Sequence, residues 1–170
     1  MDERVSVIIV DDEMISRGYM ELFIKPSRKY EVTASLPFAS DALAWCRNRE
    51  RDLPDLILMD VMMANEIDGL TAAGNIKKEF PSVRIIITTS MADADWLDKA
   101  RAAGIEGFWF KNYPQMSLLD AMDKVMFGET VYCLSGRSPG SGAWKSSGLP
   151  PWHRRQRSRT KTSKNRIGNS

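Results

Sequence analysis

Short runs of apolar residues alternate with longer, mixed stretches over residues 5–127. The runs are rich in Ile, Val and aromatic side chains, and three of them are nearly continuous, which is typical of strands covered on both faces. We expect five strands, at residues 5–10, 30–36, 56–59, 83–88 and 107–110.

The stretches between these runs repeat apolar residues three and four positions apart, which places them on one face of a helix. Pro54 and Pro81 stand just before two of the runs, where a proline ends the preceding helix. Strands and helices in this alternation predict a parallel sheet with helices on both sides. Three expected helix faces are Ile15, Tyr19, Leu22 and Phe23; Ala39, Ala42, Leu43 and Cys46; and Leu118, Met122, Val125 and Met126.

The pattern changes after Tyr132. Residues 135–151 are rich in Gly, Ser and Pro, and residues 152–170 are basic and polar, so neither stretch shows a periodic apolar face. The net charge of +2 combines 22 acids and 15 bases in residues 1–130 (net −7) with nine bases and no acid in residues 131–170 (net +9). We therefore expect one folded domain over residues 1–132 and a disordered basic tail over residues 133–170 that attracts DNA only non-specifically.

Composition also narrows the class of protein. The opening residues are acidic, and no apolar run approaches the 18 residues of a membrane span, so we expect a cytoplasmic protein without membrane contact. Cys46 and Cys133 lack metal-type spacing and are expected to be reduced thiols. The one histidine, His153, lies in the tail, so the folded part can form no Ser-His or Cys-His catalytic pair.

Polar residues follow the predicted strands at their carboxyl ends, which meet at one edge of a parallel sheet. Asp11 and Asp12 follow the first strand, Asp60 the third, Thr89 the fourth and Lys111 the fifth. An aspartate can act as a nucleophile and form an acyl phosphate, and a hard divalent cation held by the other carboxylates offsets the repulsion between anions. A lysine and a hydroxyl can bind phosphoryl oxygens. This set suits phosphoryl transfer onto a carboxylate.

Residues 4–127 resemble the receiver domain of bacterial two-component response regulators. The motifs that carry the resemblance are Val-Asp-Asp-Glu (10–13), Leu-Met-Asp-Val-Met-Met (58–63), Asp-Gly (68–69), Thr-Ser (89–90) and Gly-Phe-Trp-Phe-Lys (107–111), with Lys111 22 residues after Thr89. The resemblance implies a doubly wound (βα)5 flavodoxin-like receiver fold around a five-stranded parallel sheet.

The same resemblance implies that Asp60 is the phosphoacceptor. Asp11 and Asp12 would be the acidic pair that binds Mg²⁺ or Mn²⁺ together with Asp60, with Asp12 the direct ligand and Asp11 acting through water. The main-chain carbonyl of Met62 would be a further ligand, and Lys111 would bind the phosphoryl group.

Thr89 would be the switch hydroxyl and Phe108 the aromatic residue that changes rotamer with it. The implied donor is a sensor histidine kinase, and the implied protein contact is a homodimer through helix 93–103, strand five and helix 115–127. The chain would transfer a phosphoryl group from the donor onto its own aspartate and would lose it slowly. It would not act as an enzyme on other molecules.

Two positions depart from the usual receiver pattern. Ala64 stands four residues after Asp60, where receivers usually have proline, and Gly69 follows nine residues after Asp60 instead of eight. Asn112 follows Lys111, where receivers often have proline. These differences concern the loops around strands three and five.

Three other classes fit less well. A nucleotide or flavin binder needs a phosphate-cradling loop where Asp11 and Asp12 stand. A haloacid-dehalogenase-type phosphatase needs a second aspartate where Met62 stands. The third class is a DNA-binding regulator of LuxR type, because residues 118–132 resemble the last receiver helix and exit of that group. The 38 residues after Tyr132 lack the apolar stripes of a helix-turn-helix module. A truncated or frameshifted LuxR-type regulator, a native basic tail and a cloning scar remain open.

Overall fold

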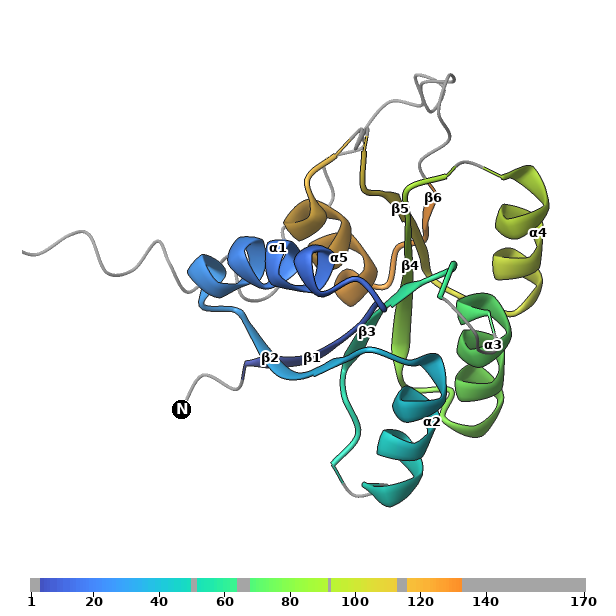
Figure 1. Cartoon of the computed structure of the whole chain (residues 1–170), viewed down its shortest axis with the longest axis horizontal. Helices are drawn as coiled ribbons and strands as arrows, with labels where there is room; N and C mark the ends of the chain where they lie inside the picture. Colours follow the sequence, from blue (N-terminus) through green and yellow to red (C-terminus); the bar gives the residue numbers. More distant parts are fainter. Residues whose placement is uncertain (1–3, 50–51, 64–67, 92, 113–115, 133–170) are drawn as a thin grey trace, which may run out of the picture. The chain divides into compact units, whose positions relative to one another are not determined.

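The computed structural model describes residues 4–49, 52–63, 68–91, 93–112 and 116–132. Strands and helices alternate along the chain, as the apolar pattern predicted (Figure 1). The strands are β1 (Val5–Val10), β2 (Tyr30–Leu36), β3 (Leu56–Asp60), β4 (Arg84–Thr89), β5 (Gly107–Phe110) and β6 (Val131–Tyr132). The helices are α1 (Met14–Ile24), α2 (Ala39–Asn48), α3 (Gly69–Glu79), α4 (Ala94–Ala102) and α5 (Leu118–Phe127), with a 3₁₀ turn at Lys25–Ser27.

The sheet is parallel throughout and has the order β2-β1-β3-β4-β5-β6. Helices α1 and α5 cover one face, and α2, α3 and α4 cover the other (Figure 1). Because helices lie on both faces, every residue of β3 is buried, as are Val7–Val10 of β1 and all of β4 except Arg84. The doubly wound α/β fold expected from the sequence is confirmed.

The expected count of five strands is wrong, because a sixth strand extends the sheet. After α5 the chain turns at Gly128, whose φ of 96° is left-handed and suits glycine. Val131 and Tyr132 then pair with Gly107 and Phe108 at the outer edge of β5. The Tyr132 hydroxyl also donates to the main-chain carbonyl of Ile105. A strand of two residues, Val131 and Tyr132, is too short to be predicted from an apolar run in the sequence.

The apolar face predicted for the first helix does not pack on the core. Ile15, Tyr19, Leu22 and Phe23 of α1 are all exposed, and the helix buries Met20 and Ile24 instead. Both sets have helical spacing, so periodicity alone could not decide which one faces the sheet. The faces predicted for α2 and α5 do lie against the core, where their members are buried or partly buried.

Some predictions fall outside the described residues. They include the basic tail at residues 133–170, the domain boundary after Tyr132, and the state of Cys133. Cys46 is buried in α2 without a disulfide, and its burial raises the pKa of the thiol to about 11. Within the described ranges, no helix has the length and apolar character that a membrane crossing requires.

Gly69 lies where α3 touches the end of β3. Its N–H donates to the Val61 carbonyl at 3.0 Å, and the preceding Asp68 caps the helix by accepting from the Thr71 N–H at 2.8 Å. A Cβ at position 69 would lie 1.7 Å from the main-chain oxygen of Asp60. Only glycine allows this approach, although it stands one position later than receivers usually place it.

We expect Gly69→Ala to lower the free energy of unfolding by more than about 2 kcal/mol, because the new methyl group forces α3 away from Asp60. Gly74→Ala is the matched control on the same helix, where a Cβ would make an ordinary contact of 3.7 Å with the Ala103 side chain. That control should gain roughly 0.5–1 kcal/mol from helix propensity. Urea unfolding measures both, and equal stabilities of the two variants would contradict the steric argument.

Candidate functional site

Strand ends bring the predicted site residues to one edge of the sheet. Asp60 and Thr89 are the last residues of β3 and β4, and Asp11 and Lys111 follow β1 and β5 directly. Strand-like hydrogen bonding continues past the strand ends, since the Asp11 N–H donates to the Leu36 carbonyl at 3.1 Å and the Lys111 N–H to the Thr89 carbonyl at 2.8 Å. These main-chain hydrogen bonds therefore fix the positions from which the Asp11 and Lys111 side chains extend.

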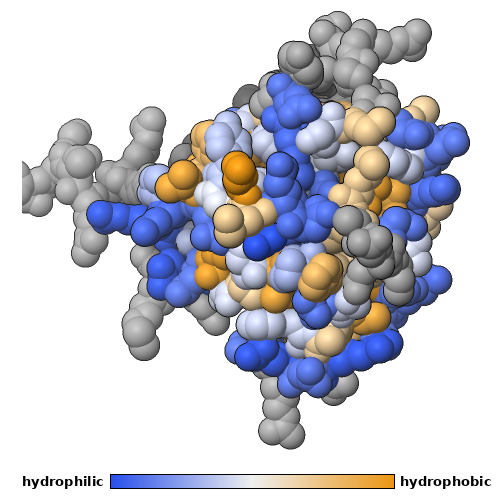
Figure 2. All heavy atoms as spheres, in the orientation of Figure 1, coloured by the Kyte–Doolittle hydropathy of each residue, from blue (hydrophilic) through white to orange (hydrophobic). Residues whose placement is uncertain are grey.

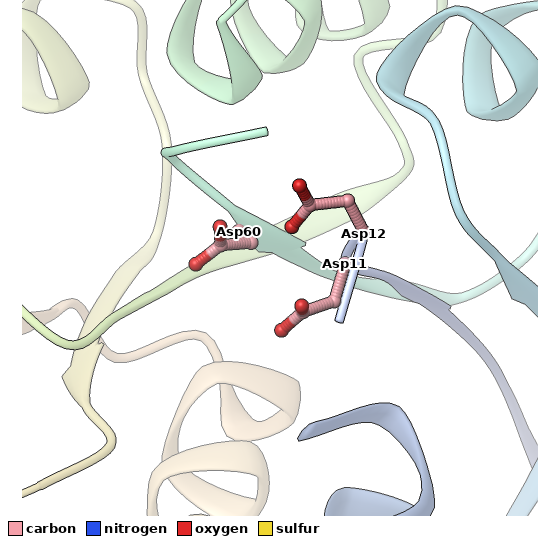
Figure 3. Close-up of side chains that lie close together, drawn as sticks. All are labelled: Asp11, Asp12 and Asp60. Atoms are coloured by element: carbon pink, nitrogen blue, oxygen red, sulfur yellow. The ribbon is translucent and has the colours of Figure 1, made fainter. Parts of the chain in front are cut away.

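Three carboxylates gather at this edge (Figure 3). Asp11, Asp12 and Asp60 each offer an oxygen, and these atoms all lie within 4.8 Å of one another. Asp11 and Asp60 are 1% and 5% exposed, whereas Asp12 is exposed. Carboxylate oxygens at this spacing, partly open to solvent, are the donor set that hard divalent cations prefer. The residues present thus fit an Mg²⁺ or Mn²⁺ ion.

Lys111 is the cation that the chain itself supplies. Its Nζ donates to Asp60 Oδ1 at 2.8 Å and to Asp11 Oδ2, and its side chain is 14% exposed. Burial alone would lower the pKa of Lys111, but the hydrogen bonds to Asp11 and Asp60 outweigh it, so the pKa is raised. One ammonium is thus shared by two buried carboxylates.

The pKa of Asp60 is also raised. Burial raises the pKa of its carboxyl, Lys111 opposes the rise only in part, and the charges of Asp11 and Asp12 add to it. The raised pKa of both Asp60 and Lys111 is consistent, because Lys111 has two carboxylate partners while Asp60 shares a single ammonium. The ionised form of the Asp60 carboxyl is therefore disfavoured at this edge.

Residues on the first turns of α1 hold Asp11, and sequence reasoning missed them. The Ser16 hydroxyl donates to Asp11 Oδ2 at 2.7 Å and the Glu13 N–H to Oδ1 at 2.9 Å. Arg17 Nη1 donates to the main-chain carbonyl of Asp11 at 2.6 Å. The signal was available, because a hydroxyl and a guanidinium five and six residues after Asp11 face back toward the strand end.

A pocket of about 400 Å³ opens above the carboxylates, and Met62, Thr89 and Lys111 are among its lining residues. The Thr89 hydroxyl accepts from the Met91 N–H at 3.2 Å. Phe108 is fully buried, lies opposite Ile87 in the sheet and is not among the described residues that line this pocket. The structure thus gathers all the predicted site residues except Phe108 around one opening.

The comparison with known families is specific. A family model described as response regulator receiver domain matches residues 7–123. The response regulator protein VraR of Staphylococcus aureus (strain NCTC 8325 / PS 47) is 28% identical over 128 residues, which are 75% of this chain and 59% of VraR. VraR of Staphylococcus epidermidis is 27% identical over the same shares. The chain thus spans less than two thirds of the length of these relatives.

Solved structures support the same fold. A LuxR-family two-component response regulator from Aurantimonas sp. SI85-9A1 matches with a TM-score of 0.69 and 25% identity, over 76% of this chain and 90% of that one. The isolated receiver domain of RcsB from Salmonella enterica serovar Typhimurium has a TM-score of 0.65 at 22% identity, over 76% and 94% of the two chains. At that identity the second match supports the fold alone.

The raised pKa of Asp60 predicts a pH-dependent cost in the metal-free protein. A carboxyl whose folded pKa lies above its ordinary value of 3.8 makes folding less favourable as pH rises from that value through the folded pKa. Asp60→Asn removes this term, so its stability advantage over the wild type should grow across that window and then level off.

Urea unfolding at a series of pH values, in buffers stripped of divalent cations, measures the difference. Asp98→Asn removes a carboxylate whose side chain is 78% exposed and controls for the loss of one charge. If the wild type instead becomes more stable relative to Asp60→Asn as the pH rises, the effect of Lys111 on the pKa of Asp60 outweighs the effect of burial.

Proposed function

The chain belongs to the response regulator receiver family, and from this premise we propose that Asp60 accepts a phosphoryl group from a phosphohistidine of a sensor kinase. The observation that carries the proposal is a buried Asp60 carboxylate 2.8 Å from Lys111 and close to two further carboxylates. A structural ion pair needs one carboxylate for one ammonium, whereas here Asp11 and Asp60 share Lys111. A site that receives a cation and then a phosphoryl group uses such a cluster of carboxylates.

In the proposed reaction an Asp60 oxygen attacks the phosphorus of the donor. The new P–O bond forms as the P–N bond to the donor imidazole breaks, and the imidazole then takes up a proton. The donor would belong to another molecule, because the described part of the chain contains no histidine. Lys111, already bonded to Asp60 at 2.8 Å, would follow the negative charge onto the phosphoryl oxygens.

The proposed Mg²⁺ or Mn²⁺ ion would be held by Asp12, Asp60 and the main-chain carbonyl of Met62. Asp11 suits a contact through water, since both of its oxygens accept hydrogen bonds from Glu13, Ser16 or Lys111. When bound, the ion would offset the repulsion between the carboxylates and the incoming phosphoryl group. The chain's own residues would orient the acceptor and exclude water from its buried side.

Transmission would run through Thr89 and Phe108 to the surface of α4, β5 and α5. Thr89 lines the site pocket, and Phe108 is fully buried opposite Ile87, two residues before Thr89 on β4. In the proposed switch, a change in the Thr89 hydroxyl alters the space available to the Phe108 ring. The proposed output is an altered protein contact on that surface, including a homodimer, in the cytoplasm. The chain would lose its phosphoryl group slowly and would not act as an enzyme on other molecules.

A second candidate is a LuxR-type transcription regulator, favoured by the match to a LuxR-family response regulator at 25% identity. In that case the receiver would control a DNA-binding partner domain. Both candidates share the phosphoacceptor step, so they differ in output and not in the chemistry of the site.

We expect the wild-type chain to take up one phosphoryl group from a phosphohistidine kinase or a small phosphodonor, and Asp60→Asn to take up none. The amide keeps the shape of the carboxyl but lacks its nucleophilic oxygen pair. Phosphate-affinity gels or intact mass measure the stoichiometry. Asp98→Asn, on the exposed face of α4, should behave as wild type, and a full equivalent on Asp60→Asn would contradict the assignment.

The same assay tests the cation. Uptake should stop when divalent cations are chelated, and Asp12→Ala should slow it by roughly a factor of ten or more. Uptake at the wild-type rate without a divalent cation would exclude the proposed role of the carboxylate pair.

Thr89→Val should still accept the phosphoryl group but transmit it poorly, because the valine cannot hydrogen-bond the phosphoryl oxygens. Thr88→Val is the matched control, since the Thr88 hydroxyl is buried without a hydrogen-bond partner among the described residues. Amide exchange in α4, β5 and α5, with and without phosphodonor, measures the response. An unchanged response in Thr89→Val would separate Thr89 from transmission.

A further inference from the structure

A larger hollow lies beside the phosphoryl site. Its volume is about 760 Å³, against about 400 Å³ for the pocket above the carboxylates, and α3 and α4 both supply side chains to it. On the side of the molecule that carries these two helices, hydrophobic atoms reach the surface among hydrophilic ones (Figure 2). A volume of this order is usual for sites that bind small molecules. We call this hollow the α3–α4 pocket, and its lining includes Val61, Met62, Met63, Leu70, Trp96 and Lys99.

The deep part of the α3–α4 pocket is apolar. Val61 and Met63, which follow β3, and Leu70 at the start of α3 are all buried and line it. Trp96 of α4 is half-buried and also lines it, so an indole ring stands beside these aliphatic side chains. A flat, apolar body can therefore pack there against both aliphatic and aromatic atoms.

Two polar residues of the lining satisfy each other. Asp68 Oδ1 accepts from the Thr71 N–H at 2.8 Å, and Asp68 Oδ2 accepts from the Thr71 hydroxyl at 2.9 Å. These bonds cap the start of α3, so both residues already have a structural task. Neither is the group that would recognise a ligand.

Lys99 is the polar group that is left. Within the described residues its ammonium has no ion-pair or hydrogen-bond partner. Lys77 and Lys111, by contrast, are bonded to carboxylates at 2.6 and 2.8 Å. An ammonium without a partner, at the edge of an apolar pocket, suits an anionic group of a ligand.

We propose that the α3–α4 pocket binds a small organic anion that carries an aromatic ring. The ring would pack beside Trp96 on the buried aliphatic side chains, and the anionic group would lie at Lys99. A ligand with several negative charges fits less well, because one ammonium stands against two carboxylates, Asp12 and Asp68, in the lining.

Two residues connect this pocket to the phosphoryl site. Asp12 and Met62 line both the α3–α4 pocket and the pocket above the carboxylates. Asp12 opposes the binding of an anion, and a divalent cation on Asp12 would offset that repulsion. Binding of the cation and of the organic anion should therefore favour each other, and by the same factor in both directions. This coupling rests on the proposed function, whereas the ligand site itself does not.

NMR of the full 170-residue chain tests the site, with cinnamate as the probe and without phosphodonor. The chain has five tryptophans, so proton–nitrogen spectra give separate indole signals, and Trp96→Phe identifies the signal of Trp96. Cinnamate should shift that signal in a saturable way, with a dissociation constant in the millimolar range or tighter for so small a ligand.

Trp45 is the internal control for non-specific binding. The Arg49 guanidinium lies 3.7 Å from the centre of the Trp45 ring, so an aromatic ring and a cation occur together there, outside the α3–α4 pocket. An aromatic anion that binds to any such pair would move the Trp45 signal as much as that of Trp96. The proposal expects the Trp96 signal to move and the Trp45 signal to stay.

A neutral analogue and a charge variant test the role of Lys99. Cinnamamide has the same ring without the charge, and it should bind roughly threefold more weakly or worse. Lys99→Gln should raise the dissociation constant of cinnamate by a similar factor and leave that of cinnamamide unchanged. Lys78→Gln is the matched control, because Lys78 is an exposed lysine of α3 that is not among the lining residues.

The coupling has its own test in the same spectra. Mg²⁺ should tighten cinnamate binding roughly twofold or more and leave cinnamamide binding unchanged. Asp12→Asn should tighten cinnamate binding without Mg²⁺ and abolish the effect of the ion. Intact cinnamate binding that does not respond to Mg²⁺ would overturn the coupling.

Three results would overturn the ligand site. They are a Trp96 signal that cinnamate does not move at any soluble concentration, equal movement of the Trp45 and Trp96 signals, and equal affinities for cinnamate and cinnamamide. Phosphoryl uptake by the same samples separates the two proposals. Uptake without a shift of the Trp96 signal contradicts the ligand site alone, and a saturable shift without uptake contradicts the proposed function alone.

Discussion

Crowding of carboxylates at one edge of a parallel sheet is the constraint on which the site depends. Parallel pairing carries the ends of β1 and β3 to the same place, and Asp11, Asp12 and Asp60 come with them. The core beneath is apolar, and Lys111 offsets part of this charge through its bonds to Asp11 and Asp60. The position of Lys111 is set by the pairing of β5 with β4, and β5 is in turn covered at its outer edge by β6. The short last strand thus supports the strand that Lys111 follows.

Helix α3 contacts both the end of β3, where Asp60 lies, and the residue before β5, the strand that Lys111 follows. At its start, Gly69 touches the main chain of Asp60. Near its end, Lys77 donates to Glu106 at 2.6 Å and to the Val83 carbonyl at 2.9 Å, while Glu106 accepts from the Ile85 N–H at 2.9 Å. Because Glu106 immediately precedes β5, one helix contacts the strand of Asp60 at one end and the strand that leads to Lys111 at the other. Asp60 and Lys111 therefore keep their spacing partly through main-chain and ion-pair contacts outside the site.

The apolar pattern was sufficient for the strands and for the site edge, because a strand buried on both faces leaves a continuous run and a polar residue marks its end. It was insufficient where short or ambiguous signals decide the structure. Val131 and Tyr132 form a strand only because the edge of β5 is there to receive them. In α1, two apolar sets share the helical period, and the sheet buries Met20 and Ile24 while Ile15, Tyr19, Leu22 and Phe23 stay exposed. The spacing of Ser16 and Arg17 from Asp11 was compatible with a role at the site, but the bonds themselves depend on where the first turn of α1 begins.

Helix α5 is bonded to two separate parts of the sheet. Its Asp123 accepts from Lys29 and from the Tyr30 hydroxyl, at 2.8 and 2.7 Å, and so joins it to the segment that follows α1. Before its start, the Met116 carbonyl accepts from Trp109 Nε1 of β5 at 3.0 Å. Any displacement of α5 must therefore break the Asp123 bonds or carry Lys29 and the start of β2 with it. Because Trp109 of β5 is bonded to the residue before α5, β5 and β2 at opposite parts of the sheet are joined through this one helix.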